Sequence, residues 1–313
     1  LMESGVKANV LVCRTEHPIS DDIKRKLALF CNVKQGAVIE SIDAKTIYDV
    51  PLLMQAEGLD KVVLEQLNLP APGTADLDRW KAFLYKFKNP KQTIHIGLVG
   101  KYVELQDSYK SIIEAVSHAG AINETKVEIH SIHSEYLTIE NVTEKLTGLD
   151  GVIVAPGFGE RGIQGKIEAI RYVRENNIPF LGICLGMQMA VIEYARNVLK
   201  LDTANSIEMD ANCADPVISI MEDQKTIVDK GGTMRLGLWK CALKAGSLVH
   251  AVYGDTEIEE RHRHRYEFND AYKKAIEDAG LVASGINPET GLVEVVENPN
   301  HPWFVGVQYH PEY

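Results

Sequence analysis

The sequence predicts an α/β fold with an open, doubly wound sheet for the part of the chain that follows Thr93. Short apolar runs bounded by glycine or proline alternate there with amphipathic stretches of helical periodicity. The apolar runs are continuous, which is typical of parallel strands that are buried on both faces. Strand alternating with helix therefore indicates a mostly parallel sheet covered by helices on both sides.

The expected elements follow in order along the chain. Apolar runs predict strands at 9–13, 94–99, 127–132, 151–154 and 179–183. Apolar residues at helical spacing predict helices at 21–30, 107–120, 163–173 and 187–199, and we expect Asp107 to cap the second of these helices and Gly120 to end it. After Asn205 the pattern favours antiparallel strands, expected at 216–221, 266–268 and 303–309.

A break near residue 70 predicts more than one domain. The chain has 313 residues, about twice the length of a typical domain. Residues 69–74 contain two prolines and a glycine, which interrupt any regular element. We therefore expect a first domain at 1–68, an interdomain linker at 69–92 and a second domain at 93–313. The chain opens on Leu1 and stops at Tyr313, and we expect it to be a fragment of a longer protein.

Composition and charge exclude several classes of function. The chain has 33 basic and 44 acidic residues, a formal net charge of −11, which discourages binding to nucleic acid or acidic membranes. Its five cysteines are an odd number without a C-x-x-C pair, so neither a disulfide framework nor a zinc site is expected. The most apolar window, 178–192, is too short to span a bilayer. These features indicate a cytoplasmic protein.

The sharpest local motif is G-x-C-x-G at 182–186, between a predicted strand and a predicted helix. Glycines on both sides allow a strained turn that exposes Cys184 at the carboxyl end of the strand, as in a nucleophile elbow. The helix that follows points its N-terminus at the sulfur, and we expect it to lower the pKa of the thiol. A buried structural cysteine in a glycine-rich turn is the alternative interpretation.

A histidine and a carboxylate lie together at the end of the last predicted strand. His310 and Glu312 are two residues apart, and His310 is 126 residues after Cys184. A thiol that attacks an amide needs a base, and that base needs an acceptor that holds it in the right tautomer. Alone, the pair would more often be a solvated turn, but together with the elbow it predicts a Cys-His-Glu triad.

The glycine-rich loop 155–159 follows another predicted strand. Such a loop at the edge of a parallel sheet can aim a backbone N–H at a developing oxyanion, with the Leu185 amide as a second donor. Pro156 has no N–H, which leaves Gly157 as the donor from the loop. An ordinary turn between strand and helix is the alternative.

The run E-R-H-R-H-R-Y-E at 260–267 is strongly basic in an acidic chain. Alternation along a strand places its three arginines on one face and His262 and His264 on the other. Two histidines without a third ligand do not make a metal site, and we assign no metal ligand to this chain. A solvated strand and a carboxylate-binding arginine remain as alternatives for the arginine face.

With these motifs in view, the chain resembles the CTP synthase family, and residues 93–313 resemble its class I glutamine amidotransferase domain. The matching words are GLVGKY (97–102), DSYKS (107–111), LGICLGMQ (181–188), ANS (204–206), GGTMRLG (231–237), the basic run and HPE (310–312). LALFCNV (27–33) and GLD (58–60) resemble the end of the family's P-loop-type α/β amidoligase domain.

The resemblance implies a glutaminase whose ammonia serves the ATP- and magnesium-dependent amination of UTP to CTP. It implies that Cys184 is the nucleophile, His310 the base and Glu312 its orienting group. It also implies a glutamine site in which Glu208 binds the substrate ammonium and Arg265 the substrate carboxylate, and whose other members are Gly157, Leu185, Gly186, Met187 and Gln188.

The resemblance also implies nucleotide contacts and partners. Lys26 matches a pyrimidine-nucleotide contact, Asp43 falls in an ATP-contact segment, and 231–237 matches a lid loop associated with activation by GTP. Glutamine hydrolysis itself needs no cofactor, and the family assembles as homotetramers and filaments. The phosphate-binding loop, the magnesium ligands and a C-terminal helix of the family have no counterpart here, so we expect this chain alone to act at most as a glutaminase.

Two other functions fit parts of the pattern. The chain could be a non-catalytic oligomerisation or regulatory module of the same enzyme, which turnover of glutamine with and without GTP would distinguish. A cysteine peptidase or other cysteine hydrolase would share the elbow but would give no reason for Glu208 and Arg265.

Overall fold

The computed structural model describes residues 3–70, 73–105, 107–220 and 234–313. The chain divides into two compact units, Leu1–Pro90 and Lys91–Tyr313. The division falls inside the expected linker 69–92, and the limits of the three expected segments stay predictions. No helix in the described part of the chain is both long enough and apolar enough to cross a membrane.

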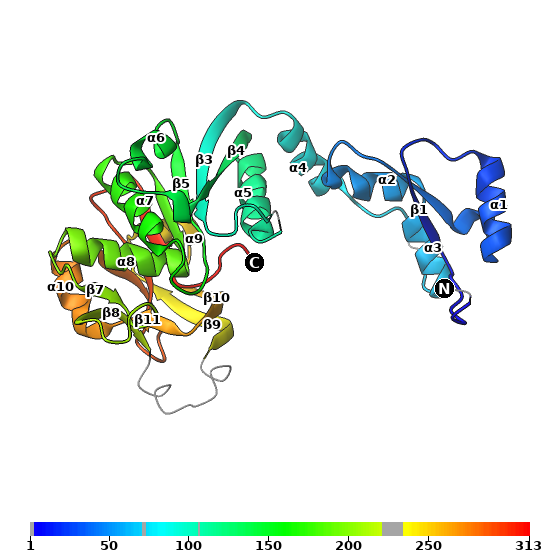
Figure 1. Cartoon of the computed structure of the whole chain (residues 1–313). Helices are drawn as coiled ribbons and strands as arrows, with labels where there is room; N and C mark the ends of the chain where they lie inside the picture. Colours follow the sequence, from blue (N-terminus) through cyan, green and yellow to red (C-terminus); the bar gives the residue numbers. More distant parts are fainter. Residues whose placement is uncertain (1–2, 71–72, 106, 221–233) are drawn as a thin grey trace. The chain divides into compact units, whose positions relative to one another are not determined.

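The described residues of the first unit form two parallel strands and four α-helices, which Figure 1 shows in blue to cyan. The strand expected at 9–13 is β1 (Leu11–Thr15), and it pairs in register with β2 (Val38–Ile42). The helices are α1 (Asp21–Cys31), α2 (Val50–Ala56), α3 (Leu59–Gln66) and α4 (Asp78–Lys88). The helix predicted at 21–30 is therefore present as α1. It begins after Ser20, whose side chain accepts a hydrogen bond from the Ile23 N–H.

Helix α4 lies within the expected linker, and it belongs to the first unit, where it packs against Tyr48. Its aromatic residues Trp80, Phe83 and Phe87 surround the ring of Tyr48, with ring centroids 4.9 to 6.0 Å away. The Trp80 indole N–H also donates to the Tyr48 carbonyl oxygen at 2.8 Å. The segment between the breaks at 69–74 and Pro90 is thus an ordered helix with an aromatic contact face.

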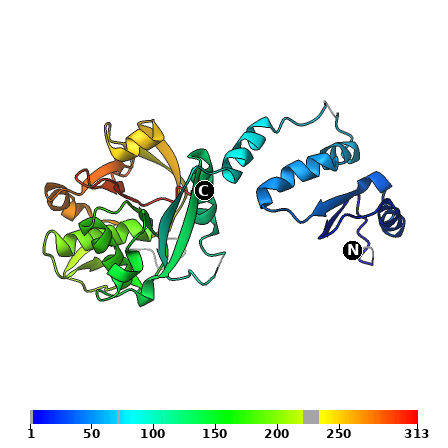
Figure 2. The ribbon, with the colours of Figure 1, turned by 90° about the horizontal axis from the view of Figure 1, so that it is seen from above.

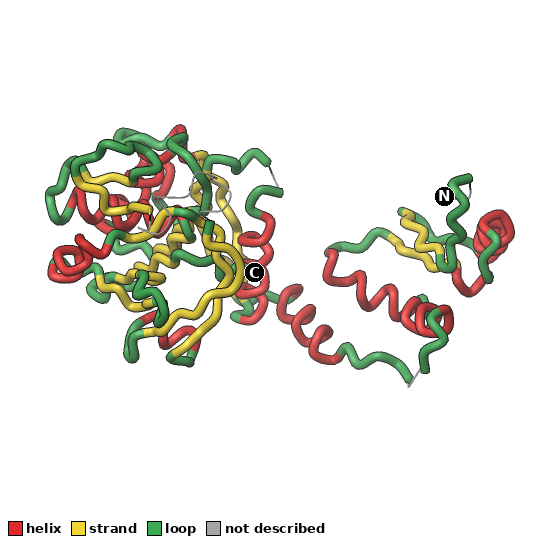
Figure 3. The backbone as a smooth tube through the Cα atoms, turned by 90° about the horizontal axis from the view of Figure 1, so that it is seen from below, coloured by secondary structure: helices red, strands yellow, loops and turns green. Residues whose placement is uncertain are grey.

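In the part of the second unit that the structure describes, nine strands form one sheet, which confirms the α/β fold with a large open sheet. Strands β14, β6, β5, β3 and β4 are parallel neighbours, whereas β10, β9, β12, β13 and β14 pair antiparallel. In sheet order the strands are β10 (Glu257–His264), β9 (Arg235–Leu243), β12 (Val282–Ile286), β13 (Val293–Glu297), β14 (Phe304–Val307), β6 (Phe180–Ile183), β5 (Gly151–Val154), β3 (Gln92–Gly100) and β4 (Thr125–His133). Figure 3 shows the strands in yellow and the helices in red.

Helices cover both faces of the parallel half of this sheet. Ile112 of α5 packs with Leu98 and Ile183 on one face, and Ile167 of α7 packs with Val152 on the other. The helices of this unit are α5 (Lys110–Ile122), α6 (Val142–Leu146), α7 (Ile163–Glu175), α8 (Leu185–Asn197), α9 (Leu248–Tyr253) and α10 (Lys273–Asp278). Figure 2 shows them around the sheet from above. Successive side chains of a strand point to opposite faces of the sheet, and both faces are covered, so β5 and β14 are buried at every position.

The later part of the unit contains the strands expected after Asn205. A small sheet joins β11 (Tyr266–Phe268), β8 (Asp215–Ile220) and β7 (Ala204–Ser206). Residue 221, the end of the strand expected at 216–221, lies outside the described residues. The strand expected at 303–309 is β14, which pairs antiparallel with β13 and parallel with β6. It therefore joins the two halves of the large sheet.

The limits predicted for α5 were wrong at both ends. The helix begins after Tyr109 without a side-chain cap, not after Asp107, and it continues through Gly120 to Ile122. A Cβ at Gly120 would lie 2.7 Å from the Thr125 carbonyl oxygen. Gly120 is therefore required for the close approach of the chain that enters β4, and it does not end the helix.

Candidate active site

The turn between β6 and α8 holds Cys184 in a strained backbone conformation. Its φ is 52° and its ψ is −103°, a region that residues other than glycine rarely adopt. The Cys184 N–H donates to the Val307 carbonyl oxygen of β14 at 2.7 Å, which ties the turn to the neighbouring strand. The cysteine is thus the N-cap of a 13-residue helix at the carboxyl end of a central strand.

The two glycines of the elbow motif are required by close packing. A Cβ at Gly182 would lie 2.7 Å from the Gly186 carbonyl carbon, and a Cβ at Gly186 would lie 2.2 Å from the Val154 carbonyl oxygen. Either side chain would collide with backbone, which cannot move away cheaply. The spacing G-x-C-x-G therefore follows from the contact among β5, β6 and the start of α8.

The pKa expected for Cys184 was wrong in direction. The side chain is only 3% exposed, and burial raises the pKa of the thiol to about 12. The Leu185 backbone N–H and the Lys166 ammonium act in the opposite direction but do not compensate. Desolvation of the thiolate therefore exceeds the effect of the helix N-terminus, and the free thiol is protonated at neutral pH.

His310 and Glu312 form a hydrogen-bonded pair beside this cysteine. The His310 Nδ1 lies 2.9 Å from the Glu312 Oε1, and the His310 backbone N–H donates to the Arg261 carbonyl oxygen. Cys184, His310 and Glu312 line one pocket of about 280 Å³. The structure thus brings all three predicted triad residues to one pocket, with Nε2 of the histidine left as the ring nitrogen that can accept a proton.

Three hydrogen bonds from or to side chains hold the glycine-rich loop 155–159 in place. The Lys166 ammonium donates to the Ala155 carbonyl oxygen at 2.5 Å, and Lys101 donates to the Phe158 carbonyl oxygen. The Gly159 N–H donates to the Glu208 Oε1 at 2.9 Å. These contacts fix the loop that carries Gly157 beside the cysteine, and they show that Glu208 already has a structural partner.

Most of the predicted glutamine-site residues line a narrow recess next to Cys184. Gly157, Leu185, Gln188, Glu208 and Arg265 line it together with Cys184. The Gln188 amide nitrogen donates to the carbonyl oxygen of Tyr266 at 2.9 Å, so this side chain braces the recess wall.

Two residues of the predicted glutamine site lie elsewhere. Met187 is fully buried in the main core, where it packs against Gly306, and Gly186 packs against the Val154 backbone. Successive residues of α8 point in different directions, so residues that are consecutive in the sequence do not all line the recess.

Lys166 is a site residue that sequence reasoning missed. It is fully buried on α7, and burial lowers the pKa of its ammonium to about 7, with the nearby Lys101 as the next cause. A signal was present, because the lysine interrupts the apolar stripe of Ile163, Ile167 and Ile170. A charged residue on a core-facing stripe is uncommon and marks a position with a special partner.

The two histidines of the basic run belong to a group of buried polar side chains, which we call the buried polar layer. Its members are Arg235, His262, His264, Glu267 and Glu294. Alternation holds as expected, since His262 and His264 are buried and Arg263 is exposed. His262 Nδ1 lies 2.8 Å from His264 Nε2, within hydrogen-bond distance. Burial lowers the pKa of His262 to about 3. Neutral imidazoles in this position serve packing and hydrogen bonding, which explains why the run alternates arginine with histidine.

Arg235 is the buried cation of the same layer. Its guanidinium bonds Glu294 at 2.7 Å and Glu267 at 3.2 Å. Burial nevertheless raises the pKa of Glu267 to about 8. Arg235 comes from the segment 231–237 that was matched to a lid loop. Residues 231–233 of that segment lie outside the described residues.

The predicted nucleotide contacts of the first unit lie at separate places. Lys26 is exposed on α1, with its ammonium 3.4 Å from Asp22. Asp43 bonds Arg14 at 3.1 Å and lines a hollow with Arg14 and Ser41. Lys26 is not among the residues that line this hollow.

Comparison with known proteins places the chain in a family. The family model "Glutamine amidotransferase class-I" matches residues 104–313, and the model "CTP synthase N-terminus" matches residues 1–69. The chain therefore belongs to the class I glutamine amidotransferase family.

More particular relatives are CTP synthases. The CTP synthase of Flavobacterium psychrophilum is 67% identical over 313 residues, all of this chain and 58% of that protein. The CTP synthase of Bacteroides fragilis is 53% identical over all of this chain and 59% of its own length. The chain thus spans less than two thirds of the length of these relatives.

A solved structure matches the second unit's fold. It is the glutaminase domain of Trypanosoma brucei CTPS with bound acivicin, 37% identical, with a TM-score of 0.66, covering 70% of this chain and 86% of that one. The fold and the family predicted from the sequence are thereby confirmed.

Proposed function

We propose that residues 91–313 hydrolyse glutamine to glutamate and ammonia through Cys184, His310 and Glu312. The observation that carries the proposal is the His310–Glu312 pair at 2.9 Å, which lines the same pocket as the strained Cys184. This arrangement has the nucleophile, base and orienting acceptor that amide cleavage requires.

The steps follow from the positions of these groups. The Cys184 sulfur attacks the amide carbon of glutamine while its proton passes to His310, which returns the proton to the leaving nitrogen so that ammonia departs. Water then attacks the thioester, again with His310 as base, and releases glutamate. Because burial raises the pKa of the thiol to about 12, proton transfer to His310 has to accompany the attack.

Substrate binding and oxyanion stabilisation are assigned to the recess beside the cysteine. Arg265 would bind the glutamine carboxylate and Glu208 the ammonium group, since both line the recess with Cys184. The N–H groups of Leu185 and Gly157 would stabilise the oxyanion. Glu208 also accepts from Gly159, so substrate binding and the loop that carries Gly157 share one carboxylate.

The relatives extend the proposal to the longer protein. We infer that the ammonia serves a glutamine-hydrolysing CTP synthase, a ligase of pyrimidine biosynthesis that aminates UTP with ATP and magnesium. GTP as allosteric activator, nucleotide contacts at Lys26 and Asp43, a homotetramer that forms filaments and a cytoplasmic location belong to the same proposal. Its support is the 67% identity to a CTP synthase over the whole chain.

The test of the glutaminase is turnover and labelling of the purified chain. Acivicin or another glutamine-like electrophile should modify Cys184 and spare Cys13, Cys31, Cys213 and Cys241, as peptide mapping would reveal. Glutamine should protect Cys184 from the reagent. Equal modification of Cys241, or absence of turnover with and without GTP, would instead favour a non-catalytic module.

The role of the ammonia is tested in a protein extended to the length of the relatives. There Cys184→Ala should abolish CTP formation from glutamine but spare formation from added ammonia, because the sulfur serves only to break the amide. Comparable loss of both rates would contradict this division of labour.

A further inference from the structure

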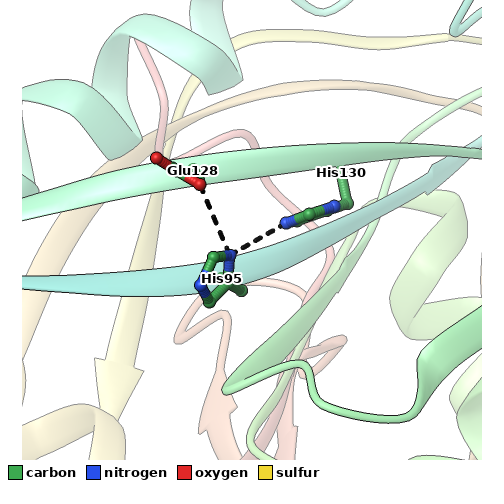
Figure 4. A group of neighbouring side chains, drawn as sticks. All are labelled: His95, Glu128 and His130. Carbon is green, nitrogen blue, oxygen red and sulfur yellow. Dashed lines mark hydrogen bonds and ion pairs between the residues drawn. The ribbon is translucent and has the colours of Figure 1, made fainter.

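Two neighbouring strands of the large sheet carry three metal-ligating side chains that point toward one another (Figure 4). His95 lies on β3, and Glu128 and His130 lie on β4, the last strand in the order of the sheet. His95 is the register partner of Glu128, and His130 is two residues further along the same face of β4. The parallel register therefore places all three side chains on one face of the sheet.

The ligand atoms converge closely enough to share one ion. His95 Nδ1 lies 3.0 Å from His130 Nε2 and 3.6 Å from Glu128 Oε2, and the three ligand atoms lie within 4.8 Å of one another. Two ligands on a tetrahedral Zn²⁺ with ordinary bond lengths are roughly 3.3 Å apart. The first two separations lie on either side of that value, so small side-chain rotations would complete the set.

Hydrogen bonds from neighbouring residues position Glu128 and the strand at His95. Lys126 bonds the other carboxylate oxygen, Glu128 Oε1, at 2.6 Å. This hydrogen bond leaves Glu128 Oε2 facing His95. Asp150 accepts a hydrogen bond from the His95 backbone N–H at 2.8 Å and donates its own N–H to the His95 carbonyl, which fixes the strand beneath the ring.

We propose that His95, Glu128 and His130 bind a divalent transition-metal ion, with Zn²⁺ as the best match. Two imidazoles and one carboxylate with a fourth position open to water are a common Zn²⁺ ligand set. All three residues are at least partly accessible, so an ion can enter from solvent. The bound ion would join β4 to β3. The site shares no residue with the Cys184 pocket and does not depend on the glutaminase assignment.

The test is titration of the whole chain with Zn²⁺ and with Co²⁺, in which Co²⁺ reports the ligands by its absorption. We expect one equivalent at this site, visible d–d bands without a thiolate charge-transfer band, and a rise in the melting temperature of roughly 5 °C at saturating metal. His95→Ala and His130→Ala should each weaken binding at least tenfold, and the double variant should lose it. Glu128→Gln, which keeps the side-chain shape, should weaken it about tenfold.

The matched control is His133→Ala, on the same strand but with its ring stacked on Tyr136. It should bind metal like the parent, and the ligand variants should keep the parent's melting temperature without metal. If His95→Ala does not fold, Glu128→Gln and His95→Gln carry the comparison. Undiminished binding in the folded ligand variants, or a thiolate band in the Co²⁺ complex, would overturn the proposal.

Discussion

Cys184 and Cys241 are the two buried cysteines of the described chain, and they differ in backbone conformation and in neighbouring groups. They are 3% and 0% exposed, and burial raises the pKa of each thiol to about 12. Cys184 stands at a strained turn with a helix N-terminus and the His310–Glu312 pair beside it. Cys241 lies within β9 and packs with Leu243, Val295 and other apolar residues.

The comparison teaches that burial and pKa do not identify a nucleophile here. Both thiols are protonated at neutral pH, so neither is reactive by itself. What distinguishes Cys184 is a base within the same pocket and backbone donors near the sulfur, which lower the barrier only when substrate is bound. The described buried residues that pack in one cluster with Cys241 include no histidine and no carboxylate; they are Leu243, Val249, Val295, Val305, Val307 and Tyr309.

The largest effect is expected from the two cysteine-to-alanine variants. Cys184→Ala should reduce glutamine hydrolysis by at least about 10⁴-fold, because members of a triad act as a unit. Alanine keeps the Cβ, so the backbone of the turn is not altered. Cys241→Ala should retain turnover within about twofold and lose about 1 kcal/mol of stability. Steady-state ammonia release measures both; similar losses in the two variants would remove the distinction.

The base and its orienting group come next. His310→Ala should lower kcat for glutamine about as much as Cys184→Ala does, because the two residues act as a unit. Glu312→Ala should have a milder effect, roughly 10²-fold, since water can partly replace the carboxylate. His250→Ala on α9 is the control and should leave kcat unchanged. A mild effect of His310→Ala would mean that another base serves Cys184.

A third prediction concerns Lys166, whose ammonium lowers the pKa of the Cys184 thiol. Its pKa falls from 10.5 to about 7 on folding, so between these values the unfolded chain holds a proton that the folded chain lacks. Stability of the parent therefore rises with pH across this window and is lowest below it.

Lys166→Met removes this slope. The variant's stability relative to the parent should fall by about 3 kcal/mol between roughly pH 7.5 and 9.5. Urea unfolding at several pH values measures the difference, with the exposed Lys145→Met as control. Parallel stability curves for parent and Lys166→Met would show that the folded lysine keeps its proton.

The smallest effect is expected at the recess. Arg265→Lys should raise the KM for glutamine about tenfold with little change in kcat, because a planar guanidinium can bond a carboxylate at two points and an ammonium cannot. Arg263→Lys on the same run is the comparison variant. It should change the KM less, because Arg263 lines the Cys184 pocket but not the recess. If Arg263→Lys were the impaired variant, the assignment of the two arginines would be reversed.

Local sequence determined much of this protein's fold and site. The glycines at 182 and 186 predicted a tight turn. The structure shows why glycine is required there, because a Cβ at either position would collide with backbone. The alternation of His262 and His264 with arginines follows from the two-residue period of an extended strand. His310 meets Glu312 because the two residues are neighbours in a short turn after β14. The spacing of apolar residues within each segment predicted whether it is a strand or a helix, because this spacing depends only on neighbouring residues. The alternation of strands with helices then predicted the sheet.

Only the tertiary structure decided what depends on segments far apart in the chain. The pKa of Cys184 is raised by desolvation that distant segments impose. They include β10, which carries Arg263, and Gln308, the residue after β14, whose atoms lie 4.0 and 3.8 Å from the sulfur. The register of β3 with β4 brings His95 to Glu128. Sequence periodicity assigns a residue to a face, but it does not say which residue of another segment lies opposite, because that is fixed by the packing of the whole core.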